Sequence, residues 1–209
     1  MRKDLVLLVP DKNTEGALKG ALERHRALGI REITFDFRTH EGRDGGVRTN
    51  GVETVCAERH RFEHALMVFD FEGCGENQGR TREGLEADLS KKLKAMWGIK
   101  SEVVVINPEV DIWMWGSNDS LARVLRWQES DTIRTWLGTK NFTFGDAQKP
   151  HRPKEAIESI FRHLKIPRSS AIYQDIAGKI SLQNCIDTAF VRMRNQLQQW
   201  FPNNLSGKE

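Results

Sequence analysis

The sequence has no long apolar run: its hydrophobic stretches fall well short of the ~20 residues that a membrane-spanning helix needs. The initial Met-Arg-Lys-Asp leads into an apolar segment without the pattern of a signal peptide. Only three cysteines are present, Cys56, Cys74 and Cys185, and no CxxC pair. These absences argue against a disulfide framework or a zinc finger. They lead us to expect a reducing, cytoplasmic location without membrane association.

Two enzyme signatures are also missing. No GxSxG motif occurs, so the sequence does not support a serine-hydrolase triad. The segment Gly73-Cys-Gly-Glu-Asn-Gln-Gly79 has the spacing GxGxxxG, which differs from the GxGxxG of dinucleotide-binding folds, and a tight turn is the better interpretation. The formal net charge is only +3, which permits a polyanionic partner without requiring one.

Short apolar segments alternate with amphipathic ones along the first half of the chain. We expect strands at 4–10, 30–37, 65–69 and 102–106, helices at 16–27, 52–62 and 83–97, and a polar loop at 39–51. Helix-length crossovers between apolar strands predict an α/β fold, with a mainly parallel, Rossmann-like sheet of about four strands flanked by helices. The second half reads as helices near 120–126, 131–138, 154–164, 171–176 and 185–200. We therefore predict an α/β core over 1–116 and a helical region over 117–209 packed on it.

The stretch 64–72 is the most informative, because an apolar strand there ends in Asp70 and Glu72. If the strand continues to Glu72, both carboxylates face the same side, where they repel each other unless a cation lies between them. Acids follow two other predicted strands: Asp11 with Glu15, and Glu109 with Asp111. The carboxyl ends of parallel strands share one edge of the sheet, and hard oxygen ligands there suit Mg²⁺ or Mn²⁺.

Each of these patterns has a simpler interpretation. Acids after strands also serve as solvated turns or helix N-caps, and Glu15 fits that role best. Four arginines flank the acidic strand ends and either hold phosphates of a nucleic acid or form a solvated rim: Arg43, Arg48, Arg80 and Arg82. Four tryptophans either stack on bases or anchor the core: Trp113, Trp115, Trp127 and Trp136.

Three motifs together resemble a known family. Asp11-Lys-Asn-Thr-Glu15, Asp70-Phe-Glu72 and Pro108-Glu-Val-Asp-Ile-Trp113 are similar to the Glu-Gly-x-Thr-Glu, Asp-x-Asp and Glu-x-Trp motifs of the Toprim-like proteins of bacterial defence islands, including the RloB-like group. The resemblance to components of the methylation-associated defence system covers essentially the whole chain. It implies a Toprim-like fold, in which a glutamate and an Asp-x-Asp pair bind Mg²⁺ for phosphodiester chemistry.

The resemblance also implies roles for individual residues. Asp11 stands at the position of the first glutamate, with Glu15 as the second acid of that motif. Asp70 and Glu72 stand at the Asp-x-Asp, and Asp111 at the glutamate before Ile-Trp. Asp11, Asp70, Glu72 and Asp111 would then hold Mg²⁺ or Mn²⁺, while Glu15 or Asp111 completes the site or acts as general base.

Three substitutions depart from the family pattern. Lys12 replaces a glycine and could steady a phosphate. Asp11 is shorter than the family's glutamate and Glu72 is longer than its aspartate, so charge is kept but reach changes. The resemblance thus implies a metal-dependent nuclease of an antiphage defence system. The alternatives are a non-catalytic subunit that binds nucleic acid or partner proteins of the defence complex, and a nucleotide or signal sensor.

Overall fold

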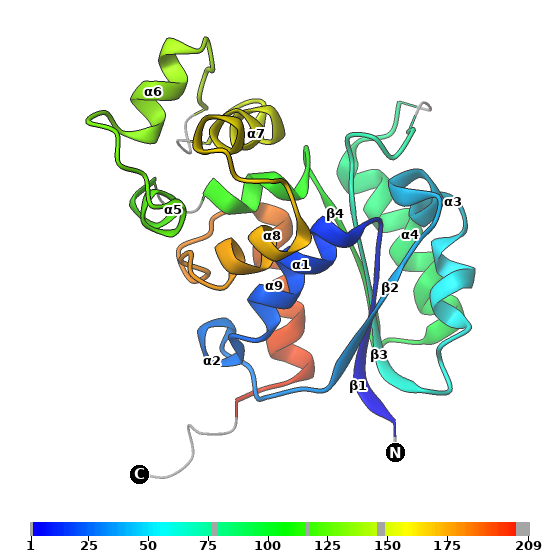
Figure 1. The fold of residues 1–209 in the computed structure, drawn as a ribbon. Coiled ribbons are helices and arrows are strands. Elements are labelled where there is room, and N and C mark those ends of the chain that lie inside the picture. Colours follow the sequence, from blue (N-terminus) through cyan, green and yellow to red (C-terminus); the bar gives the residue numbers. More distant parts are fainter. Residues whose placement is uncertain (1, 77–78, 116–117, 146–148, 204–209) are drawn as a thin grey trace.

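The computed structural model describes residues 2–76, 79–115, 118–145 and 149–203. Four strands within these residues form one sheet in the order β2-β1-β3-β4, and every neighbouring pair is parallel. The strands are β1 Lys3–Val9, β2 Phe35–Thr39, β3 Phe62–Asp70 and β4 Ser101–Ile106. Helices flank the sheet on both faces (Figure 1). The predicted α/β class with a Rossmann-like parallel sheet is confirmed.

The central strands β1 and β3 are apolar because both of their faces are buried. Successive side chains of a strand point to opposite faces. Leu5 and Leu7 accordingly belong to one hydrophobic cluster, and Val6 and Leu8 to another. The sheet therefore separates two cores.

One core lies under α3 (Arg43–Cys56) and α4 (Arg82–Trp97), whose apolar side chains pack on the face that carries Val6 and Leu8. The other is larger and lies under helices from both ends of the chain: α1 (Lys12–Leu22), α8 (Ser170–Ala177) and α9 (Thr188–Trp200). The short α2 (His25–Leu28) follows α1. Figure 1 shows these two helical layers on opposite sides of the strands.

The remaining elements follow β4. They are the 3₁₀ helix η1 Val110–Trp115, α5 Asn118–Leu125, α6 Ile133–Thr139 and α7 Pro153–Leu164. We call the described part of residues 118–164 the helical extension. In Figure 1, α6 and α7 lie at the top, on the side toward which the strands' carboxyl ends point. The helices predicted for the second half match α5 to α9 to within a few residues, whereas the predicted boundary at 116–117 falls outside the described residues.

Two glycines let α1 approach α8 closely. A Cβ atom added at Gly16 would lie 2.3 Å from the carbonyl oxygen of Ser170, and one added at Gly20 would lie 2.3 Å from that of Gln174. Real Cβ atoms do not approach an oxygen so closely, so the backbones can meet only where these side chains are absent. The contact holds the second half of the chain against the first.

The segment after α9 closes the lower end of the sheet. Pro202 forms an isolated antiparallel bridge with Ile30, and the Arg31 N–H donates to the Phe201 carbonyl at 3.1 Å. The His64 ring, on β3, lies 4.7 Å from that of Phe201 and 5.0 Å from that of Trp200. Residues from the two ends of the chain therefore complete one packed unit.

Four predicted elements were wrong in their bounds. The helix expected at 52–62 begins earlier, at Arg43, and ends at Cys56, and Phe62 already belongs to β3. The loop expected at 39–51 is mostly helix α3, and Gly51 lets this helix pack closely on β3, since an added Cβ would lie 2.8 Å from Met67 Cε. The strand expected at 30–37 begins only at Phe35. The helix expected at 16–27 starts at Lys12, because Asp11 caps it, and ends at Leu22.

Candidate functional site

Acidic side chains gather at the edge of the sheet where the strands end. Asp11 follows β1, Asp70 is the last residue of β3, and Glu109 and Asp111 follow β4. Asp44, in the first turn of α3, joins them because its carboxylate accepts a hydrogen bond from the Asp70 backbone N–H at 2.9 Å. We call these five residues the acidic edge.

Asp70 lies at the centre of the acidic edge and is only 8% exposed. Its Oδ1 accepts from the Val110 N–H at 2.9 Å, which ties the end of β3 to the start of η1. Burial raises the pKa of Asp70 well above its ordinary value, and the neighbouring carboxylates Asp44, Asp111 and Glu109 raise it further. Ionising Asp70 in the folded protein is therefore costly.

Asp11 caps the first turn of α1. Its Oδ1 accepts from the backbone N–H groups of Asn13 at 2.9 Å and Thr14 at 2.8 Å, which would otherwise be unpaired at the helix start. Lys12 pairs with Glu15 at 2.7 Å, and Glu15 also accepts from the Thr39 hydroxyl at 3.1 Å. Because the Lys12 side chain is 70% exposed, this pair is a surface feature.

Asp111 is 1% exposed and is held by a helix from the second half of the chain. The Tyr173 hydroxyl, on α8, donates to Asp111 Oδ1 at 2.7 Å, and Arg168 Nη2 lies 3.9 Å from Oδ2. Burial raises the pKa of Asp111, while Tyr173 and then Arg168 oppose the rise. Glu109 has a similar position and pairs with Lys154 Nζ of α7 at 2.8 Å.

Glu72 differs from the other acids. Strand β3 ends at Asp70, so the condition under which Asp70 and Glu72 would face the same side of one strand is not met. The backbone N–H of Glu72 donates to the Pro108 carbonyl at 3.1 Å, while the residue as a whole is exposed. Glu72 nevertheless lies near enough to the acidic edge that its charge contributes to the raised pKa of Glu109.

One oxygen each of Asp11, Asp70 and Asp111 already accepts a hydrogen bond from the protein. Asp11 and Asp70 direct oxygens at backbone N–H groups, Asp111 directs one at Tyr173, and Glu72 is exposed. Among the residues that the structure describes, no three His, Cys, Asp or Glu side chains form a group that could hold a metal ion. The Mg²⁺ or Mn²⁺ site stays a prediction.

Three of the four arginines proposed to bind nucleic acid are tied to the protein itself. Arg48 Nε donates to the Cys74 carbonyl at 2.7 Å, Arg80 pairs with Glu76, and Arg82 pairs with Glu83 at 2.7 Å and Glu86 at 3.3 Å. Arg43 is exposed at the first residue of α3. These contacts favour a structural role for Arg48, Arg80 and Arg82, in which they hold parts of the chain against each other.

Asp44 is the residue of this site that reasoning from the sequence missed. It lay in the stretch Arg43-Asp-Gly-Gly46, where the glycines indicated a loop. The signal that could have found it is an acid in the first turn of a helix, where the dipole favours negative charge. Burial raises the pKa of Asp44, and the nearby Asp11 contributes to the rise.

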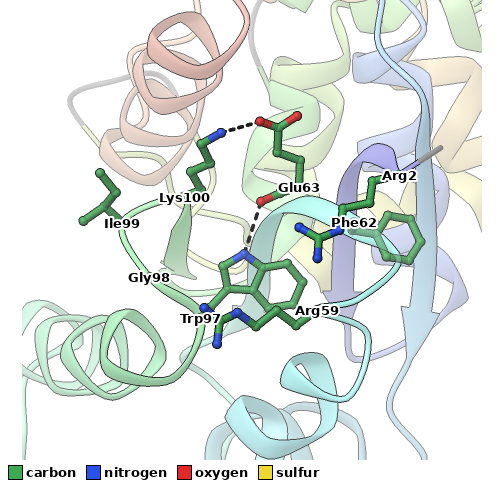
Figure 2. A pocket seen from close by; sticks show the side chains of 8 residues that line it. All are labelled: Arg2, Arg59, Phe62, Glu63, Trp97, Gly98, Ile99 and Lys100. Atoms are coloured by element: carbon green, nitrogen blue, oxygen red, sulfur yellow. Dashed lines mark hydrogen bonds and ion pairs between the residues drawn. The ribbon is translucent and has the colours of Figure 1, made fainter.

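A separate hollow of about 530 Å³ lies at the opposite edge of the sheet, near the amino ends of β1 and β3. Figure 2 shows Glu63 paired with Lys100, and the Trp97 indole donating to the Glu63 carbonyl, at 3.3 Å. Arg59 donates to the carbonyl of Met96 at the carboxyl end of α4, at 3.0 Å. The charged groups here complement helix ends and each other, and they lie away from the acidic edge.

Comparison with protein-family models, with curated proteins and with solved structures found no match. None of the helices within the described residues combines the length and the apolar character needed to cross a membrane. The function must therefore be argued from the residues themselves.

Proposed function

We propose that the chain is a non-catalytic, nucleic-acid-binding subunit of a multi-protein antiphage defence system, built on a Toprim-like core. The defence context rests on the resemblance of its three motifs to the Toprim-like proteins of bacterial defence islands. The observation that carries the non-catalytic assignment is that carboxylates of the acidic edge already have protein partners.

Each partner serves the fold. Asp11 satisfies the start of α1, and Asp70 joins β3 to η1 through the Val110 N–H. Asp111 and Glu109 receive Tyr173 and Lys154 from the second half of the chain. A metal ion that bound through these same oxygens would displace donors that are buried or at helix starts, and an unpaired buried donor costs about 1–3 kcal/mol.

The alternative is a Mg²⁺- or Mn²⁺-dependent nuclease, and one observation favours it. The carboxylates of Asp11, Asp44 and Asp70 come from three different elements and lie near enough that charge on one raises the pKa of the next. Asp44 would then take the place that the resemblance gives to Glu72. The two functions predict opposite results in one experiment.

We expect the double variant Asp70→Asn with Glu72→Gln to keep its protective effect against phage. The reason is that Asn keeps an oxygen for the Val110 N–H, and that Glu72 is exposed. The wild-type protein should show no Mn²⁺-stimulated nicking of plasmid DNA or cleavage of RNA, and should bind nucleic acid equally well with EDTA present. Plaque counts, nicking gels and a binding titration measure the three properties.

The matched control is Asp131→Asn with Glu53→Gln, two exposed acids whose replacement changes the charge by the same amount. Metal-stimulated cleavage that the site double variant abolishes and the control retains would establish the nuclease instead. Loss of protection in the site variant alone, with unchanged nucleic-acid binding, would also contradict a structural role for the acids.

A further inference from the structure

Cations cover aromatic rings at three places in the helical extension. Arg134 lies 4.8 Å from the Phe144 ring centre, Lys140 5.6 Å from Trp136, and Arg152 5.0 Å from Phe142. Four further contacts of this kind are spread over the rest of the described residues, whereas these three fall between residues 133 and 152. The concentration marks this surface as unusual within the chain.

None of these three cations forms an ion pair within the described residues. Some basic side chains elsewhere, such as Lys3 and Arg192, pair with carboxylates at 3.2 Å or less, whereas among the described residues exposed ones such as Lys91 form no ion pair. An arginine lying over a ring keeps outward N–H groups that no protein acceptor uses. Arg134, Lys140 and Arg152, which we call the row for their order along the chain, therefore offer positive charge to an anionic partner.

Aromatic side chains stand beside this row. Trp127 lies 5.4 Å from Trp136, and His163 of α7 lies 4.7 Å from Trp136 and 5.5 Å from Trp127, measured between ring centres. Both tryptophans are half-buried, and the histidine is exposed. The rings pack the segment that follows α5 against α6 and α7 while keeping part of their surface accessible.

The extension also adjoins the acidic edge. Lys154, in the first turn of α7, pairs with Glu109, so the start of α7 is fixed at the ends of the strands. Figure 1 shows α6 and α7 on that same side of the molecule. A ligand on the extension would thus lie next to the region where ligands of parallel α/β sheets commonly bind.

We infer that the helical extension binds single-stranded nucleic acid, with Arg134, Lys140 and Arg152 holding its phosphates and the neighbouring rings contacting its bases. The inference rests on the proposed function and names the surface that performs it. Cations without acidic partners fit a chain of phosphates. Partly accessible rings near cations are the combination that single-strand-binding sites use, whereas a duplex keeps its bases stacked away from side chains.

The test neutralises the row in the full chain with Arg134→Gln, Lys140→Gln and Arg152→Gln together. Binding of labelled oligo-dT and oligo-U is measured by fluorescence anisotropy in EDTA, from low to high salt. The plot of log K, the binding constant, against log[salt] has a negative slope. Loss of three phosphate contacts should make this slope shallower by about 2, which amounts to about a hundredfold weaker binding at 0.1 M salt. Melting curves check that the variants are folded. Lys140→Gln alone, at an exposed position, should make the slope shallower by about 0.7.

The control triple Arg26→Gln, Lys91→Gln and Lys92→Gln removes the same charge from exposed positions on α2 and α4, and should bind as the wild type does. Equal losses in both triples, unchanged binding in the row variant, or tighter binding of a hairpin duplex than of single strands would each overturn the inference, while the proposed function would stand. A wild type that binds polyglutamate but no oligonucleotide would overturn both, because the surface would then fit an acidic protein.

Discussion

Replacing Tyr173 by Phe is expected to lower the free energy of unfolding by about 2–3 kcal/mol, or roughly 5–10 °C in Tm. The Tyr173 side chain is 0% exposed, and its hydroxyl donates to Asp111 and accepts from Arg168 Nε at 2.8 Å. Burial and then the Asp111 charge raise the pKa of Tyr173, so the hydroxyl keeps the proton that it donates. Phenylalanine would leave a buried carboxylate without its main donor.

The loss of unfolding free energy caused by Tyr173→Phe should depend on pH. Burial already raises the pKa of Asp111, and loss of the Tyr173 donor raises it further. The folded variant therefore holds the proton more tightly than the unfolded chain does, and its penalty is small near pH 4 and grows as the pH rises. Urea unfolding at pH 5 and pH 8 measures the difference.

A double-mutant cycle supplies the control. Asp111→Asn keeps an acceptor for the Tyr173 hydroxyl but removes the buried charge, so the two changes together should cost less than their sum by about 1 kcal/mol or more. Strict additivity would show that the bond contributes little, and would weaken the argument that the acidic edge joins the halves of the chain.

Asp70→Asn is expected to raise stability at neutral pH by about 1 kcal/mol or more, a Tm increase of roughly 2–4 °C. Asparagine keeps the oxygen that accepts from the Val110 N–H, and its amide group can face the carboxylates of Asp44 and Asp111 as a donor. The substitution removes a buried charge that these neighbours oppose.

The sign of the pH dependence follows from the raised pKa of Asp70. A carboxyl with a raised folded-state pKa favours the folded state below its unfolded pKa of about 3.9 and loses that advantage as the pH rises through the folded value. The gain from asparagine should therefore be largest at pH 7–8 and vanish toward pH 4. Asp131→Asn, at an exposed position, should leave stability unchanged at every pH; a destabilised Asp70→Asn would mean that the charge itself is needed.

The sequence was most informative where one local pattern determined an element. The apolar runs of β1, β3 and β4 could be recognised, and the four-residue spacing of Leu85, Leu89 and Leu93 predicted α4. The first part of α3 was missed because its glycines look like loop residues, and only the tertiary structure shows Gly51 packed against Met67. The local pattern there indicated a loop, whereas the tertiary structure has a helix that packs on the sheet.

The site was predictable only in part for the same reason. The parallel sheet brings Asp11, Asp70 and Asp111 to one edge, as their positions after strands indicated. Their partners were not predictable, because Tyr173 is 62 residues from Asp111 and reaches it only through the packing of α8 on α1. The hydrogen-bond partners of a carboxylate depend on residues that are distant in the sequence and are not part of any local motif.

The closure of the sheet by Phe201 and Pro202 bears on how the protein is made. β1, α1 and β3 leave the ribosome early, yet the larger core needs α8 and α9, and His64 is covered by Trp200 and Phe201. Domains generally fold as units during synthesis. One apolar face of the sheet therefore stays exposed to solvent until α9 leaves the ribosome. Nascent chains stalled before α9 should therefore engage chaperones, and the protein's yield should depend on how quickly that final segment is released.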